Sequence, residues 1–90
     1  GIDERLGNID VQAFPNPTDG QVQLVINGQE GRKVQLTVSD LSGRVFQTQQ
    51  FNGLTATFRT DLDLSGMAAG LYLLELSSED SHSVLRIVVQ

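Results

Sequence analysis

Two carboxylates, Asp61 and Asp63, have the spacing in this sequence that comes nearest to a catalytic arrangement. They flank Leu62, so on a β-strand their side chains would lie on one face, about 6.6–7 Å apart. Paired carboxylates in this range of distances serve in glycoside hydrolysis, and carboxylate oxygens also bind calcium. However, acidic residues that alternate with leucines are more often the solvent-facing side of an edge strand. We therefore expect neither catalysis nor a metal site at this pair.

The only histidine, His82, lies between Ser81 and Ser83. Neighbouring residues of a strand point to opposite faces, so neither serine is placed to form a hydrolytic pair with it. The sequence has no Gly-x-Ser-x-Gly nucleophile motif and no glycine-rich phosphate loop. Without cysteine it can form neither a disulfide nor a thiolate metal site. We expect no enzymatic activity and no cofactor.

The charge balance excludes several classes of partner. The 90-residue chain has 11 acidic and 6 basic residues and a net charge of −5. Because phosphate backbones and anionic lipid surfaces attract basic proteins, we expect no nucleic-acid partner and no binding to an anionic membrane. The apolar runs fall far short of the roughly 20 residues of a transmembrane helix, so we expect no membrane insertion. The length fits one small domain, which we expect to be monomeric on its own.

The hydrophobic pattern has a period of two, which is typical of strands with one buried face. Val34, Leu36 and Val38, for example, alternate with polar residues. Seven runs are predicted to be strands: 11–14, 22–26, 34–38, 45–51, 56–62, 71–76 and 84–89. We therefore expect an all-β fold, an immunoglobulin-like β-sandwich of about seven antiparallel strands with Greek-key connections. A closed barrel is the alternative.

Turn residues separate these runs. Asn16-Pro17-Thr18-Asp19 has the Asn and Pro of a type I turn, and Gly20 follows where a left-handed residue is needed. Asp40-Leu41-Ser42-Gly43 is a second type I pattern, and its position between two alternating runs predicts a hairpin. The segment 64–70 is the only one that could form a helical turn.

Tyr72 stands at the start of the penultimate predicted strand. That is the position of a tyrosine corner in immunoglobulin-like sandwiches, where the ring enters the core and the hydroxyl bonds a backbone group upstream. Tyr72, Leu74 and Leu76 would then share the inner face, with Glu75 pointing outward.

The last run, 84–89, is apolar on both faces except at Arg86. If its odd-numbered residues face the core, Val84 and Val88 lie beside Arg86 on the other side. Such a strand is either central and well covered, the interpretation that we favour, or a surface offered to a partner.

The first ten residues differ from the rest, since they are polar and show no clean alternation. We expect 1–10 to be a linker and 11–90 to be the folded domain. The chain begins with Gly1 rather than Met, so we interpret it as a piece of a longer protein in which the linker joins the domain to an upstream passenger.

Several motifs occur in a recognisable order along the chain. They are Phe14-Pro15-Asn16-Pro17-Thr18-Asp19-Gly20, Val38-Ser39-Asp40-Leu41-Ser42-Gly43-Arg44-Val45, Leu64-Ser65-Gly66-Met67-Ala68-Ala69-Gly70-Leu71-Tyr72-Leu73-Leu74 and Arg86-Ile87-Val88-Val89-Gln90. With these motifs, residues 11–90 resemble the C-terminal sorting domain of the type IX secretion system, type A. The resemblance implies an immunoglobulin-like domain that directs an attached passenger across the outer membrane after Sec export.

The resemblance also implies partners and a location. The partners are an outer-membrane shuttle barrel, the type IX translocon and a cell-surface sortase that cuts in the linker, and the passenger is secreted or held at the cell surface. Family members often carry Lys in the last strand and near the end, where this chain has Arg86 and Gln90. An accessory carbohydrate- or protein-binding module is the alternative function. The expected recognition residues are Pro15, Asn16, Pro17, Asp19, Gly20, Asp40, Gly43, Arg44, Gly70, Tyr72, Arg86, Val88 and Val89.

Overall fold

Seven β-strands and no helix make up residues 8–90, the part of the chain that the computed structural model describes. The strands are β1 (Asp10–Phe14), β2 (Gln21–Asn27), β3 (Val34–Asp40), β4 (Val45–Phe51), β5 (Thr57–Asp63), β6 (Gly70–Ser77) and β7 (His82–Val89). Each predicted run falls on one strand, apart from Ala56, which precedes β5. The segment 64–70 forms one turn, in which the Met67 N–H donates to the Leu64 carbonyl at 3.0 Å.

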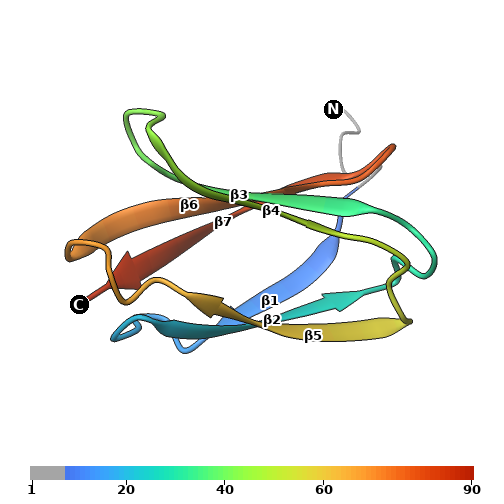
Figure 1. Ribbon diagram of the computed structural model, residues 1–90, viewed down its shortest axis with the longest axis horizontal. Helices are drawn as coiled ribbons and strands as arrows, with labels where there is room; N and C mark the ends of the chain where they lie inside the picture. Colours follow the sequence, from blue (N-terminus) through green and yellow to red (C-terminus); the bar gives the residue numbers. More distant parts are fainter. Residues whose placement is uncertain (1–7) are drawn as a thin grey trace.

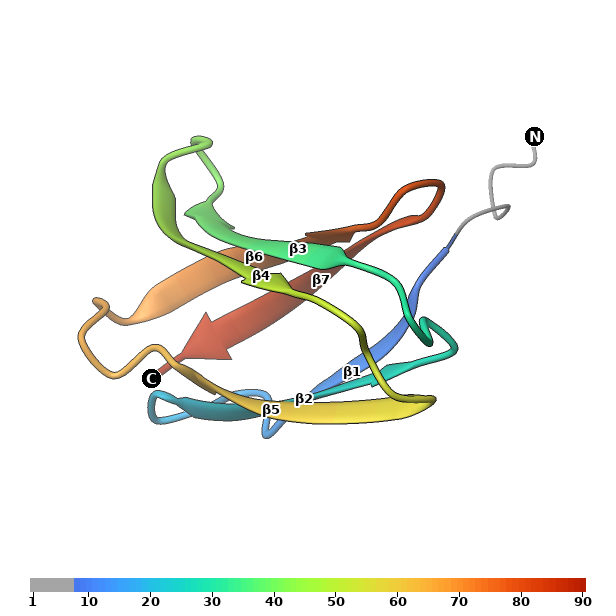
Figure 2. The same ribbon diagram turned by 45° about the vertical axis from the view of Figure 1, so that its right-hand side comes forward.

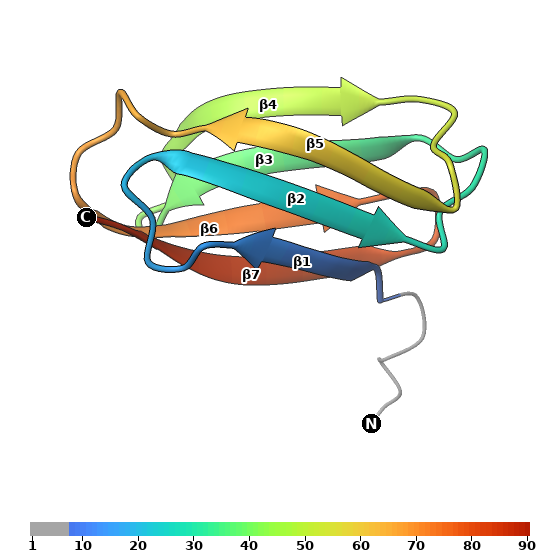
Figure 3. The same cartoon turned by 90° about the horizontal axis from the view of Figure 1, so that it is seen from below.

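The strands form two antiparallel sheets that face each other as the layers of a sandwich (Figure 1). One sheet has the order β1-β2-β5 and the other the order β4-β3-β6-β7. The pairings β2–β5 and β3–β6 join strands that are not consecutive, as in a Greek key. The predicted sandwich is confirmed. The closed barrel is wrong, because the two sheets keep separate edges, β1 and β5 in one sheet and β4 and β7 in the other. Seen from below, the three-stranded sheet lies across the four-stranded one (Figure 3).

The alternating apolar residues meet between the two sheets and form the core. Leu24 and Ile26 of β2, Leu36 of β3, Leu74 of β6 and Ile87 of β7 are fully buried there. Removing one such side chain from water contributes roughly 1.5–3 kcal/mol. A domain of this length has one core, so its stability depends on these inward positions.

The sandwich includes two residues of the predicted linker. Ile9 is buried in the core, and Asp10 begins β1. The Ser83 hydroxyl ties Ile9 to β7, since its Oγ accepts from the Ile9 N–H and donates to the Ile9 carbonyl, both at 2.8 Å. The earlier part of that segment, 1–7, lies outside the described residues.

The carboxylates of Asp61 and Asp63 lie on the outer side of β5, an edge strand, and both residues are exposed. This arrangement agrees with the interpretation of the pair as the solvent-facing side of an edge strand. Within residues 8–90, no three side chains of His, Cys, Asp or Glu are grouped so that they could hold a metal ion.

The position of β7 differs from the interpretation that we favoured. β7 pairs with β6 alone in its sheet, so it is an edge strand rather than a central one. The pattern misled because apolar residues on both faces are typical of covered strands. Near its C-terminal end, backbone groups on its open side bond to the β1–β2 connection instead.

Candidate recognition surface

The sequence motifs lie far apart along the chain but meet at one end of the sandwich (Figure 2). Asp40 of β3 stands opposite Tyr72 of β6, and Gly70 of β6 stands opposite Val89 of β7. A single parallel bridge then joins Val89 to Thr18 in the β1–β2 connection. We call this the motif end, and it comprises the segments 14–20, 40–46, 64–72 and 86–90.

Asn16 and Thr18 complete the open edge of β7. The Asn16 side chain donates from Nδ2 to the Arg86 carbonyl and accepts at Oδ1 from the Val88 N–H, both at 3.0 Å. The Thr18 N–H donates to the Val88 carbonyl and the Thr18 carbonyl accepts from the Gln90 N–H, both at 2.8 Å. An edge strand otherwise presents unpaired backbone groups. Here the side chain of Asn16 and the backbone of Thr18 take the place of a neighbouring strand.

The segment 16–19 closes no backbone hydrogen bond of its own, so the predicted turn is not a hydrogen-bonded one. Its polar groups bond to β7 instead, a partner that local sequence signals cannot show. Thr18, which the sequence reasoning missed, is buried and directs the chain into β2. Its Oγ1 donates to the Gln21 carbonyl at 2.8 Å and accepts from the Gly20 N–H at 3.0 Å, while Asp19 remains exposed.

Gly20 is required by its conformation and by its surroundings. Its φ is +133°, so the expectation of an unusual backbone there is confirmed. A Cβ atom at this position would lie 2.7 Å from the Cα of Ser65. The Gly20 carbonyl also accepts from the Leu64 N–H at 2.6 Å. The β1–β2 connection therefore packs backbone against backbone on the β5–β6 connection.

The predicted hairpin at Asp40–Gly43 is confirmed. The Gly43 N–H donates to the Asp40 carbonyl at 3.1 Å, and the Asp40 N–H donates to the Arg44 carbonyl at 3.0 Å. Gly43 has a φ of +94°, which suits a three-residue loop that ends in a left-handed residue. The Asp40 carboxylate accepts from the Ser42 hydroxyl and from the Ser42 and Arg44 N–H groups. These bonds, led by the Ser42 hydroxyl, hold the pKa of Asp40 below its usual value.

Tyr72 forms the predicted tyrosine corner. It is buried, and its hydroxyl donates to the Ala68 carbonyl at 2.5 Å. The ring meets Phe46 edge to face, with 5.5 Å between the ring centroids. The Arg44 guanidinium lies 5.2 Å from the centroid of the Phe46 ring. Through these two contacts, Phe46 links Arg44 of the hairpin to Tyr72 of the core.

Comparison with known proteins agrees with this arrangement. A sequence profile described as the secretion system C-terminal sorting domain matches residues 12–90. The chain belongs to this family. It is a sorting domain of type IX secretion, and such a domain implies a secreted or cell-surface protein.

No curated protein matches the sorting domain. Among solved structures it is similar to a DUF3244 family protein with an immunoglobulin-like β-sandwich fold from Bacteroides vulgatus. That likeness has a TM-score of 0.70 at 12% sequence identity and covers 94% of this chain and 99% of the other. It concerns the fold alone. Neither the sorting-domain family nor this fold is a family of enzymes.

The expected recognition residues divide into two groups by exposure. Gly20, Tyr72 and Val89 are buried, and Asp40 is half-buried and occupied with its own loop. For these four residues the structure shows a role in the fold. The exposed members are Pro15, Asn16, Pro17, Asp19, Gly43, Arg44, Gly70, Arg86 and Val88.

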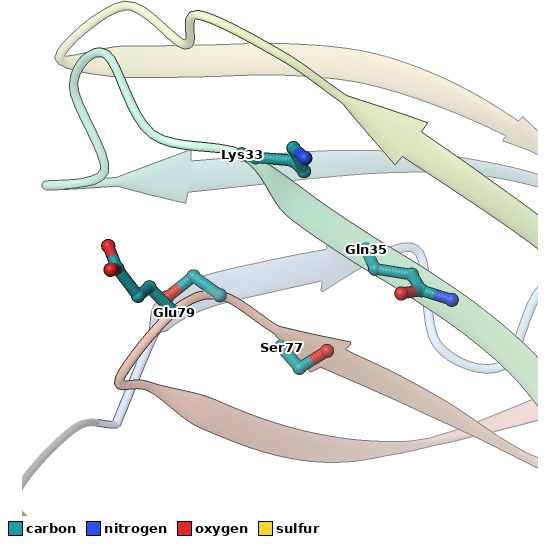
Figure 4. A pocket seen from close by; sticks show the side chains of 5 residues that line it. Lys33, Gln35, Ser77 and Glu79 are labelled. Atoms are coloured by element: carbon teal, nitrogen blue, oxygen red, sulfur yellow. The ribbon is translucent and has the colours of Figure 1, made fainter.

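The opposite end of the sorting domain carries a polar hollow of about 330 Å³ (Figure 4). Lys33 and Gln35 of the β3 side line it together with Ser77, Ser78 and Glu79 at the end of β6. None of these five side chains is aromatic, and they include one cation, Lys33, and one anion, Glu79. The hollow therefore provides no platform for stacking a sugar ring.

The described residues also include no helix that is long and apolar enough to span a membrane.

Proposed function

We propose that this sorting domain directs a passenger joined to its N-terminal side across the outer membrane, and that the secretion machinery recognises the folded motif end. The observation that supports folded recognition is the convergence of the motifs. Asn16 and Val88 come together only when β7 has formed and the β1–β2 connection has crossed to it. An unfolded chain would present the same residues with no fixed relation to one another.

In this proposal the domain passes from the translocon to an outer-membrane shuttle barrel and then to a cell-surface sortase. The sortase cuts the linker and releases the passenger from the domain. Because Ile9 is buried and bonded to Ser83, a cut that leaves the sandwich whole lies before Ile9. The passenger reaches the cell surface by way of the periplasm.

A reporter fusion tests this function. Residues 1–90 are joined to the C-terminus of a reporter that carries a Sec signal peptide. We expect surface display in a host with the type IX machinery and periplasmic retention in the same host without its translocon. The matched control is the reporter without the domain, which stays in the periplasm of both hosts. Retention of the fusion in both hosts would contradict the proposal.

The alternative function, an accessory carbohydrate-binding module, has one candidate site, which is at Phe14. This residue is 42% exposed and borders a hollow of about 290 Å³ together with Pro15, Gln23 and Asp61. A carbohydrate-binding module would stack a sugar ring on Phe14. The Gln23 amide and the Asp61 carboxylate would then bind the hydroxyl groups of the sugar. Titration with neutral glycans, followed by NMR, would then shift the signals of Phe14 and Gln23. Unchanged spectra at millimolar glycan would remove this alternative.

A further inference from the structure

The two outer faces of the sandwich differ in composition. On the three-stranded sheet most outward residues are polar, with the exposed Phe14 and the buried Val25 as the apolar exceptions; the polar ones are Asp10, Gln12, Gln21, Gln23, Asn27, Thr57, Arg59, Asp61 and Asp63. That is what a solvated sheet face presents. The outer face of the four-stranded sheet carries a group of apolar residues around Arg86 instead. The fold does not require this difference, because both sheets bury their inner faces in the same core.

These apolar residues form one continuous surface, which we call the apolar patch. The apolar patch consists of Val45, Leu71, Leu73, Val84 and Val88 around Arg86. Leu73 stands opposite Arg86 and Leu71 opposite Val88 across β6 and β7, and Ser39 pairs with both Leu73 and Val45. Val45 is 56% exposed, Val84 49% and Val88 38%, so no described segment covers them.

Polar residues border the patch along the same strands. Thr37 and Glu75 stand beside Val84, and the next row across the strands contains Gln35, Ser77 and His82. Glu75 is itself paired with His82 at 2.8 Å. An apolar centre with a polar rim is the composition of a protein–protein interface. Contiguous exposed apolar surface on a small monomer marks such a site.

Arg86 determines the chemistry of the occupant. It lies among apolar neighbours and forms no ion pair with another residue of the described part, 8–90. Two copies that met through this patch about a two-fold axis near Arg86 would bring two guanidinium groups together. An anionic lipid surface would attract Arg86, but it would repel the domain as a whole, which has a net charge of −5. A protein surface that is apolar around one carboxylate matches both the patch and Arg86.

We propose that the apolar patch is the face by which the domain docks onto a protein of the secretion machinery that offers Arg86 a carboxylate within an apolar surface. This inference rests on the proposed function and adds the face and the chemistry of the partner.

Export of the reporter fusion tests the patch with single substitutions. Arg86→Glu and Val84→Asp should each lower surface display by roughly tenfold, the loss typical of a central interface residue. Arg86→Met, which keeps the apolar stem and removes the charge, should also lower display, whereas Arg86→Lys should retain most of it. The matched controls on the other outer face are Arg59→Glu and Thr57→Asp, which should export normally.

Two further measurements keep the test specific. Thermal unfolding of the purified variants should leave the melting temperature within a few degrees, because the altered side chains are exposed. A photoreactive phenylalanine at Val84 should form a crosslink to a protein of the secretion machinery in exporting cells, and the absence of any such crosslink would contradict the docking face. The same group at Thr57 should form no such crosslink.

The outcomes separate the two proposals. A wild-type fusion that is not displayed contradicts the proposed function. If the wild-type fusion is displayed and the folded patch variants are displayed equally well, the docking face is wrong while the function stands. Full display of the Arg86→Met variant would show that the partner needs no carboxylate opposite Arg86. A dimer by light scattering that Val84→Asp dissociates, with export unchanged, would assign the patch to a second copy and overturn the inference.

Discussion

The side chain of Asn16 accepts a hydrogen bond from the backbone N–H of Val88 at 3.0 Å, although the two residues are 72 positions apart. The same amide group donates to the Arg86 carbonyl, so it spans Ile87 in the manner of a neighbouring strand. Part of the motif therefore has a structural task, which is to seal the edge of β7. Folding and recognition use the same residues, and experiments have to separate the two roles.

Replacing Asn16 with Ala should lower the free energy of unfolding by about 1–2 kcal/mol, because two hydrogen bonds to β7 are lost. Hydrogen exchange should become faster at the Val88 amide, which faces Asn16. It should stay slow at the Ile87 amide, which faces β6. Asn52→Ala, in the exposed β4–β5 loop, is the control and should change neither amide. Unaltered exchange at Val88 in Asn16→Ala would show that this bond does not protect the edge.

Gly20→Ala should lower the free energy of unfolding by more than about 1 kcal/mol, since strained backbone costs roughly 1–3 kcal/mol and the new methyl group also meets Ser65. Gly66→Ala is the matched control, because Gly66 has no positive φ and no atom would lie within 4 Å of its Cβ. It should change the stability by less than about 0.5 kcal/mol. Urea unfolding of both variants gives the comparison. Equal stability of the two would exclude the close contact with Ser65.

The predictions from sequence succeeded where the signals are local. Alternation of apolar and polar residues located seven strands, and the Asp40–Gly43 turn is specified by its own four residues. Tyr72 was assigned correctly because its bond to Ala68 spans only four positions. The partners of the Asn16 side chain and of the Thr18 backbone are some 70 residues away, so no local pattern indicates them. The edge position of β7 was missed because Val84 and Val88 make that strand look covered, while the structure leaves both exposed.

Tyr72→Phe should remove the hydrogen bond to the Ala68 carbonyl and keep the ring against Phe46. The expected loss of stability is about 0.5–1.5 kcal/mol, the net value of one such bond. Because the hydroxyl is directed inward, the exposed surface is unchanged and the reporter should still be exported. A folded Tyr72→Phe domain that fails in export would show that the hydroxyl acts in recognition as well.

The stability of the domain should fall in acid. The pKa of Asp40 is lowered in the folded state from 3.8, chiefly by the Ser42 hydroxyl, and the pKa values of Asp63 and Asp80 are lowered too. A lowered pKa contributes stability that is present above the unfolded value and is lost as the pH falls through the folded value. Urea unfolding at pH 7, 4 and 3 should therefore show a decline concentrated below about pH 4. Asp40→Asn keeps an oxygen acceptor but does not titrate, so its decline should be smaller, and an identical pH profile would exclude Asp40 as a contributor.

Deletion of Arg86–Gln90 should abolish export because the domain no longer folds. The deletion removes Ile87 and Val89, which are both buried, and losing one large apolar core side chain typically costs about 2–5 kcal/mol. Two such losses approach the entire stability of a small domain, roughly 5–15 kcal/mol. The purified deletion variant should show no cooperative thermal transition. Removal of Gln90 alone is the informative control, since it takes away one hydrogen bond to Thr18 and leaves the core intact. That shorter variant should fold and be exported through the apolar patch, and its failure in export despite a normal transition would place a contact at the last residue.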